Sequence, residues 1–180
     1  PTVLLDDGII EVSTLPLKHR IYCNGFLIRE KDKERKLTKE LIELYEVPVA
    51  QMPKLKRGED WIKKDGSVIP NEKLTIAPPK SKSYAFCTDT KFMEGLIPLI
   101  KQVDLLYHEA TFLSDLEDRA KSTYHSTAKQ AATVAKLGGV GKLILGHYSA
   151  RYKSKDLFQQ EAREVFSNSV AIDDGDVIEI

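Results

Sequence analysis

The chain has 180 residues, and its 27 basic residues are matched by 27 acidic ones, so the formal net charge is zero. This length is sufficient for a buried core and favours one domain. The balanced charge excludes a global electrostatic field for nucleic acid, so any such surface must be a local patch.

The two cysteines, Cys23 and Cys87, are far apart in the sequence and form no Cys-x-x-Cys motif. This spacing favours a reduced protein without disulfides, in which both thiols are buried as small apolar side chains. No apolar run is long enough to cross a bilayer, and the first residues lack a basic segment followed by an apolar one. We therefore expect a cytoplasmic protein with no membrane partner.

Two strands are predicted near the start of the chain, at residues 9–14 and 25–29, with His19 in the loop between them. From residue 31 to residue 82 charges crowd together, prolines recur, and one helix is predicted at about residues 36–45. This composition predicts an extended insertion at 31–82 within a main domain formed by 1–30 and 83–180. Trp61, the only tryptophan, is expected to pack within the insertion rather than stack on a base.

From Ser83 onward the pattern becomes a β/α alternation. Strands at residues 84–87, 103–107 and 142–145 alternate with helices at about 92–101, 127–137 and 154–166. The second helix is capped by Ser126 or Thr127 and stopped by the glycine pair at 138–139, and Ser154 caps the third. Both later helices carry one apolar stripe, so each covers a face of the sheet. Two short strands, at 169–172 and 177–180, close the chain around a turn at 174–175.

The four histidines, at positions 19, 108, 125 and 147, each lie in or beside a short polar segment. Imidazole and carboxylate groups are the usual ligands of catalytic zinc. Asp89 and His147 each follow a predicted strand, so both emerge at carboxyl ends of strands, where open α/β sheets place their ligands. Taken singly, Asp89 is better explained as a cap or turn residue and His147 as a satisfied histidine at the sheet margin. The set as a whole predicts a metal site assembled from several strand ends.

Three segments in this order, Tyr107–Phe112, Tyr124–Ala132 and Leu145–Tyr152, resemble motifs of ribonuclease Z, the tRNA 3′-processing endoribonuclease of the metallo-β-lactamase fold. Upstream, Phe86–Thr90 is similar to the strand that carries the family's bridging aspartate, and His19 to the histidine before its glycine-aromatic strand. The resemblance covers essentially the whole chain but only the second half of the family's protein. It implies an incomplete αββα sandwich of α/β class, with an inserted charged arm.

The resemblance also implies an activity: a zinc-dependent endoribonuclease that removes the 3′ trailer from precursor tRNA with two zinc ions in the complete enzyme. His19, Asp89 and His147 would be metal ligands, with Asp89 shared between two ions. His125, oriented by Glu109, would be the catalytic residue that stabilises the phosphate or protonates the leaving oxygen. The alternative for Glu109 is a buried carboxylate satisfied by local backbone.

One family feature is absent from the sequence: the upstream His-x-His-x-Asp-His cluster that holds one zinc and helps to hold the other. Because only three predicted ligands remain, we expect at most one weakly held metal ion in this chain alone, and no turnover. The missing amino-terminal half is therefore an implied partner beside precursor tRNA, and a homodimer is left open. His108 is expected to be structural, because neighbouring strand residues point to opposite faces.

The resemblance also implies that the insertion corresponds to the arm with which bacterial members of the family grip tRNA. Lys54, Lys56 and Arg57 in the insertion, together with Arg151 after the last long strand, are expected to contact RNA phosphates. A solvated charged hairpin without a partner is the alternative for the insertion. Two other functions stay open: a non-catalytic RNA-binding or assembly module, and another metallo-β-lactamase-type hydrolase acting on a small phosphoester or ester.

Overall fold

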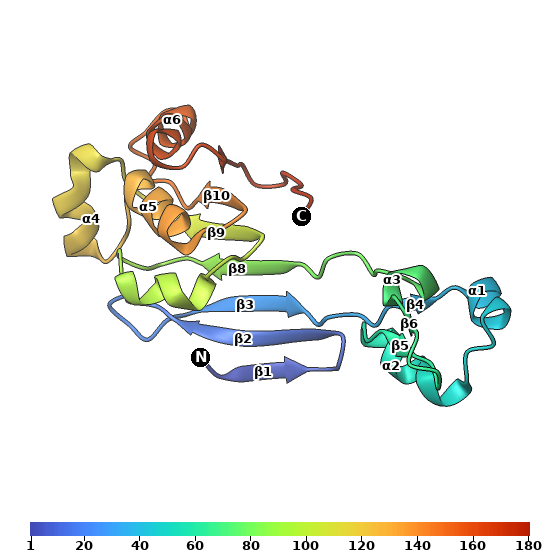
Figure 1. The fold of residues 1–180 in the computed structure, drawn as a ribbon. Coiled ribbons are helices and arrows are strands. Elements are labelled where there is room, and N and C mark those ends of the chain that lie inside the picture. Colours follow the sequence, from blue (N-terminus) through green and yellow to red (C-terminus); the bar gives the residue numbers. More distant parts are fainter. The chain divides into compact units, whose positions relative to one another are not determined.

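The computed structural model describes all 180 residues, which divide into two compact units. Unit 1 comprises residues 1–31 and 82–180, and unit 2 comprises residues 32–81 (Figure 1). Each unit has a hydrophobic core of its own. None of the helices combines the length and the apolar character that a membrane span requires.

Unit 1 is built on a seven-stranded mixed sheet. In spatial order its strands are β1 (Val3–Asp6), β2 (Ile10–Pro16), β3 (Asn24–Glu30), β8 (Ser83–Cys87), β9 (Leu105–Glu109), β10 (Lys142–Gly146) and β11 (Ser169–Ala171). The strands from β1 to β8 pair antiparallel, whereas β8, β9, β10 and β11 pair parallel. Because the parallel strands run in one direction, their carboxyl ends meet at one edge of the sheet.

The hydrophobic core of unit 1 is formed by one face of the sheet together with helices that cover it. The helical segments of unit 1 are the 3₁₀ segments η2 (Glu94–Ile100) and η3 (Ser114–Leu116) and the α-helices α4 (Glu117–Thr123), α5 (Ala128–Gly138) and α6 (Asp156–Val165), of which η2, α5 and α6 contribute buried residues to the core. Figure 1 shows α5 lying over β9 and β10, and α5 also packs against α6. The buried side chains of α5 are mostly alanines, as its stripe predicted, and small side chains permit close approach of helix and sheet.

The boundaries of α5 follow from local chemistry. The Thr127 side chain accepts a hydrogen bond from the Gln130 backbone N–H, and the Gln130 side chain accepts one from the Thr127 backbone N–H, which forms a capping box. Gly139 ends the helix in a left-handed conformation, at φ 62°, which costs glycine little. Both signals are present in the sequence, and the predicted helix is confirmed to within one residue at each end.

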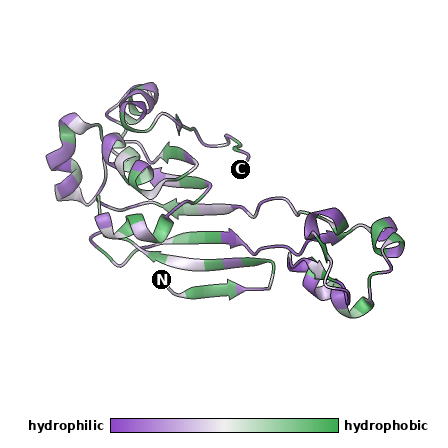
Figure 2. Cartoon of the chain, in the orientation of Figure 1, coloured by the Kyte–Doolittle hydropathy of each residue, from purple (hydrophilic) through white to green (hydrophobic).

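The opposite face of the sheet carries no helix and presents an apolar ladder, a row of side chains that pair across four strands. Phe26 pairs with Phe86, Phe86 with Tyr107, and Tyr107 with Ile144. The rings of Phe86 and Tyr107 stack at 4.7 Å between centroids. Their sequence neighbours, such as Ala85, belong to the helix-covered core, so the ladder points the other way. Figure 2 shows apolar stretches within the strands of this sheet, whereas α4 is mostly polar.

Several predicted elements of unit 1 differ from the structure. The helix expected at 92–101 is the 3₁₀ segment η2, which contains Pro98, a residue that cannot donate an α-helical hydrogen bond. Residues 177–180 pair with no strand. The N-cap of α6 is Lys155 rather than Ser154, although the Ser154 hydroxyl accepts from the Asp156 backbone N–H at 3.1 Å. The strand β1 and the helix α4 were not predicted.

Unit 2 is compact, where the sequence suggested an extended insertion. Its elements are β4 (Lys36–Leu37), α1 (Lys39–Leu44), η1 (Val49–Gln51), α2 (Met52–Lys56), β5 (Trp61–Ile62), β6 (Val68–Ile69), α3 (Asn71–Leu74) and β7 (Thr75–Ile76). Trp61 is 8% exposed and packs in a small core with Leu55 and Leu74, as expected. The predicted helix at 36–45 starts only at Lys39, because residues 36–37 pair with β7.

The two thiols differ in their surroundings. Both cysteines are free, which agrees with the expected absence of a disulfide. Cys87 is fully buried, and burial raises the pKa of its thiol to about 12. Cys23 is only half-buried, so the expectation that it is core filler is wrong for this residue.

Candidate active site

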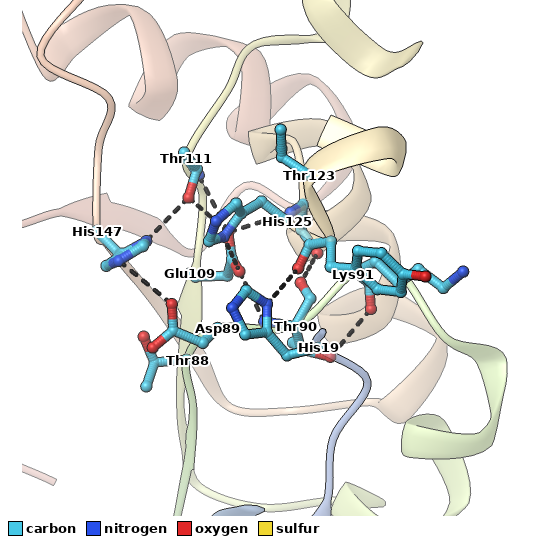
Figure 3. Close-up of polar contacts among 12 residues, drawn as sticks. His19, Thr88, Asp89, Thr90, Lys91, Glu109, Thr111, Thr123, His125 and His147 are labelled. Atoms are coloured by element: carbon cyan, nitrogen blue, oxygen red, sulfur yellow. Dashed lines mark hydrogen bonds and ion pairs between the residues drawn. The ribbon is translucent and has the colours of Figure 1, made fainter. Parts of the chain in front are cut away.

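Five of the predicted site residues come together at the carboxyl edge of the parallel strands. Asp89 lies two residues beyond β8, Glu109 is the last residue of β9, and His147 directly follows β10. His125 stands between α4 and α5, and His19 lies in the loop that joins β2 and β3. Figure 3 shows the imidazoles of the three histidines gathered around the Asp89 and Glu109 carboxylates.

Glu109 is the hub of this cluster. Its side chain is fully buried, and Oε1 accepts hydrogen bonds from the Thr90 backbone N–H at 2.7 Å and from His125 Nδ1 at 2.9 Å. Its Oε2 accepts from the Thr111 hydroxyl at 2.7 Å and from the Ser126 backbone N–H at 3.1 Å. Because both carboxylate oxygens are used inside the protein, Glu109 is suited to positioning His125 and not to binding a metal ion or substrate directly.

These hydrogen bonds also determine charge. Burial raises the pKa of the Glu109 carboxyl, but the bonds from His125, Ser126 and Thr111 outweigh it and hold the pKa below its usual value. In turn, the bond to Glu109 raises the pKa of His125 against the opposing effect of burial. A charged carboxylate and an imidazole that readily holds a second proton therefore lie side by side.

The tautomers of two other histidines follow from their partners. The Thr111 hydroxyl has a single proton, which it donates to Glu109, so its oxygen must accept from His147 Nδ1 at 2.9 Å. His19 Nδ1 donates to the Tyr124 carbonyl at 3.2 Å. Both rings therefore keep the lone pair of Nε2 available. A neighbouring oxygen that fixes Nδ1 is the usual support of a metal-binding histidine.

The available donor atoms suit a metal ion of the borderline type that imidazole and carboxylate prefer. Ligand atoms of His19, Asp89 and His125 lie within 4.8 Å of one another, and so do those of Glu109, His125 and His147. His147 Nε2 also lies 3.5 Å from Asp89 Oδ1, which connects the two groups. Since Glu109 is saturated, the donors that remain are the three imidazoles and Asp89.

Three residues at the site have strained backbone conformations, which orient their side chains toward the cluster. Asp89, Tyr124 and His147 have φ of 52°, 64° and 64°, in the left-handed region that non-glycine residues rarely adopt. Such conformations persist where surrounding contacts hold them, and they gather at functional sites. Here they turn the chain sharply at strand ends and at the end of α4.

His108 lies apart from the cluster, although it adjoins Glu109 in sequence. It is 1% exposed and faces the helix-covered core, and its Nδ1 donates to the Glu109 carbonyl at 2.7 Å. Burial lowers its pKa and keeps the ring neutral. These contacts support a structural role for His108.

The residues predicted to contact RNA lie elsewhere. Lys54, Lys56 and Arg57 are in or directly after α2 of unit 2. The Lys56 ammonium lies 3.4 Å from a Glu34 carboxylate oxygen, and the Arg57 guanidinium lies 3.1 Å from Glu59, so two of the three charges are partly compensated. Arg151 is exposed in the loop that follows β10.

Sequence reasoning missed the polar residues that support the cluster. Thr90, Thr111 and Ser126 hold Glu109, and the Ser126 hydroxyl donates to the Thr90 carbonyl at 2.7 Å. Each of these residues lies next to, or two residues from, a predicted site histidine or carboxylate. That proximity to small hydroxyl residues is the one feature of the sequence that could have indicated their role.

Comparison with known proteins is consistent with the resemblance seen in the sequence. No protein-family model matches the chain. A metallo-β-lactamase fold protein, YhfI from Bacillus subtilis, superposes on 94% of this chain and 48% of its own with a TM-score of 0.59 at 21% identity. The short form of human tRNase Z superposes on 99% of this chain and 46% of its own, with a TM-score of 0.59 at 26% identity. The fold is therefore the metallo-β-lactamase fold, as predicted.

Curated relatives are more similar to the chain than these solved structures are. Ribonuclease Z of Parabacteroides distasonis is 44% identical over 97% of this chain and 57% of its own length. Ribonuclease Z of Cytophaga hutchinsonii is 47% identical over 92% of this chain and 53% of its own. The chain is thus a homologue of ribonuclease Z, and it spans about half the length of the curated relatives it matches.

Proposed function

We propose that the chain carries a large part of the active site of a cytoplasmic, metal-dependent endoribonuclease that removes the 3′ trailer from precursor tRNA. The observation that supports it most directly is the convergence of His19, Asp89, His125 and His147 around the saturated Glu109 at one strand edge. Homology to ribonuclease Z names the reaction class. Because the chain spans only part of its relatives, the activity belongs to the complete protein.

His19, Asp89 and His147 are the residues proposed to hold metal, with zinc as the ion. Two zinc ions are proposed for the complete enzyme, and at most one weakly held ion for this chain alone, which offers few ligands. When bound, such ions lower the pKa of a coordinated water and neutralise charge on a phosphate. The Nδ1 contacts of His19 and His147 hold both rings with Nε2 available for this purpose.

His125 is the proposed catalytic acid, and Glu109 is its positioning residue. Since Nδ1 of His125 is committed to Glu109, Nε2 is the atom left to face a phosphate or a leaving oxygen. The raised pKa favours a proton at that atom, and the Glu109 carboxylate stabilises the resulting positive charge. A positioned imidazole of this kind supplies a proton in the transition state without a rearrangement of solvent.

The remainder of the protein is proposed to cover the apolar ladder of unit 1. Phe26 is 39% exposed and Phe86 and Tyr107 are half-buried, and an apolar sheet face that carries no helix is a site for packing. A second sheet there would complete the sandwich and bring the missing His-x-His-x-Asp-His cluster to the site. The metal ligands would then come from both halves.

Unit 2 is proposed to be an RNA-binding arm that acts through phosphates. Neutralising Lys54, Lys56 and Arg57 together to glutamine in the complete protein should weaken precursor tRNA binding and flatten its dependence on salt. Because Lys56 and Arg57 also pair with acidic residues, Lys54 should contribute most. The matched control is Lys39→Gln in α1 of the same unit. Equal loss of activity on tRNA and on a one-phosphate model diester would show that the arm is structural.

Cleavage of a precursor tRNA with a 3′ trailer tests the main proposal. The chain alone should be inactive, and the complete protein, or the chain supplied with the missing half, should release the trailer. RNA binding without cleavage by the complete protein would instead identify a binding module. Turnover of a small phosphoester without cleavage of tRNA would identify another hydrolase of this fold.

A further inference from the structure

A small cavity lies beside His125, on the side of α4 and α5. Its volume is about 240 Å³, and it is lined by Lys91, Phe92, Glu117, Lys121, His125 and Gln130. Typical small-molecule sites span roughly 300–1,000 Å³, so this cavity suits a fragment such as one phosphate group rather than a whole ligand. None of the lysines that line it was singled out in the sequence.

Lys91 is fixed at the rim of the cluster by its backbone. It directly follows Thr90, whose N–H donates to Glu109, and its own N–H donates to the Lys18 carbonyl at 3.1 Å. The ammonium group lies 5.1 Å from the centroid of the Tyr124 ring and forms no ion pair. Its charge is therefore held near the site by a cation–π contact alone, and remains available to an anion.

Lys121 approaches from α4, one turn before Tyr124, and is exposed without an ion pair. The single acidic residue of the lining, Glu117, accepts a hydrogen bond from the Gln130 side chain at 3.1 Å. Gln130 is itself committed to the capping box of α5. The lining therefore presents two ammonium groups against one carboxylate that already has a partner.

The other side of the cluster is acidic rather than basic. A cavity of about 310 Å³ beside His147 is lined by Tyr107, Gly146, His147, Tyr148, Ile172, Asp173 and Asp174. Two carboxylates line it, but no lysine or arginine does, and Lys155 pairs with Asp173 from outside it. The rings of His125 and His147 are 5.3 Å apart, so the change of sign occurs across the cluster itself.

We propose that the phosphodiester backbone of the RNA crosses the site on the side of Lys91 and Lys121. Their cavity would hold the phosphate next to the one being cleaved, while the carboxylate of Asp174, which has no ion pair, disfavours binding of the strand on the opposite side. Figure 3 shows Lys91 and His147 on opposite sides of the cluster. Lysines bind phosphates as point charges without reading sequence, and like charges penalise the wrong path. This inference rests on the proposed function and gives the strand a direction across the site.

The affinity of the complete protein for a short fluorescent single-stranded RNA, measured by anisotropy in EDTA over a range of KCl, tests the cavity without turnover. Lys91→Gln with Lys121→Gln should weaken binding roughly tenfold at low salt, because a charged hydrogen bond to phosphate is removed. The slope of log affinity against log salt should fall by about 0.7 for each phosphate that is no longer neutralised. The arginine pair at these positions should restore both. Lys101→Gln with Lys136→Gln, two exposed lysines outside the cavity, should change neither, and Asp174→Asn should raise affinity at low salt.

Unchanged affinity and slope in the Lys91–Lys121 variant would overturn the proposal, and so would an equal loss of affinity in the control pair. The affinity of each single glutamine variant is measured as well, and circular dichroism shows whether each variant is folded. A folding defect in the double variant would then not be mistaken for a loss of RNA binding. Failure of the wild-type protein to cleave precursor tRNA would contradict the proposed function instead. The binding comparison in EDTA is independent of that outcome.

Discussion

Glu109→Gln is the perturbation for which the structure gives the sharpest expectation. The carboxylate accepts from three backbone N–H groups, those of Thr90, Thr111 and Ser126, as well as from the Thr111 hydroxyl and His125 Nδ1. A glutamine has one accepting oxygen and a donating amide. In either orientation the amide NH₂ faces at least one backbone N–H, so two donors oppose each other. The orientation with the fewest such contacts places the NH₂ group toward Thr90 and His125.

The cost can be estimated from this arrangement. One buried N–H without a partner costs about 1–3 kcal/mol, and the surviving bonds lose charge assistance worth on the order of 1 kcal/mol each. Relief of the buried carboxylate's desolvation offsets part of this. We expect Glu109→Gln to lower the free energy of unfolding by roughly 2–5 kcal/mol, and also to place the His125 proton on Nε2 because Nδ1 must now accept.

Urea unfolding followed by far-ultraviolet circular dichroism measures this loss of stability. Fluorescence is unsuitable, because the only tryptophan, Trp61, reports on unit 2. The matched control is Glu161→Gln, since Glu161 also accepts from backbone N–H groups, at Ser114 and Lys129, but is only half-buried. A Glu109→Gln protein as stable as the Glu161→Gln control would refute the idea that Glu109 is a saturated hub.

In the complete protein, Asp89→Ala should remove bound metal and activity together, whereas His125→Ala should retain metal and lose turnover by roughly 10²–10⁴-fold. Metal analysis and an assay of trailer release distinguish the two variants. Loss of metal in both would make His125 a ligand. Gly25→Ala should destabilise unit 1 by roughly 1–3 kcal/mol, because the added Cβ would lie 2.3 Å from a backbone carbonyl oxygen of β8. Gly95→Ala is the control, since its added Cβ would lie 3.8 Å from the nearest atom, and it should lower stability less in the same urea titration. In a Cys23→Ser protein, which removes the half-buried thiol, Cys87 should resist a thiol reagent near pH 8 until the protein unfolds, since a pKa of about 12 leaves roughly one thiol in ten thousand ionised. Rapid labelling of this variant in its native state would contradict the burial of Cys87.

The strand ends of unit 1 could be predicted from sequence because short-range signals specify them. Alternation and apolar runs placed the parallel strands to within two residues at each end, and the capping box with Gly139 bounded α5. Once parallel strands are expected, the convergence of Asp89 and His147 follows from geometry. Their 3.5 Å separation is the consequence of that topology.

What the sequence could not predict depends on contacts between distant residues. The five hydrogen bonds of Glu109 join three segments of chain, around residues 90, 109–111 and 125–126, and no periodicity reveals them. Unit 2 is held together by its small core and by Asn71, whose side-chain amide donates to the carbonyls of Leu55 and Glu59 at 2.7 and 2.8 Å. The unpaired end of the chain, residues 177–180, has strand-like composition, yet strand formation requires a neighbour with free hydrogen-bonding groups.

The contacts at the site show which of its features depend on this chain alone. The orientations of His19, His125 and His147 are set by oxygens of Tyr124, Glu109 and Thr111, all within unit 1. These imidazoles are therefore positioned before any metal or second sheet arrives. Metal retention is different, because it depends on the number of ligands, and two ordered ions need more donors than three imidazoles and one free carboxylate supply. On the proposed function, proton delivery by His125 would thus be a property of this half of the site, whereas generation of the nucleophile would require both halves.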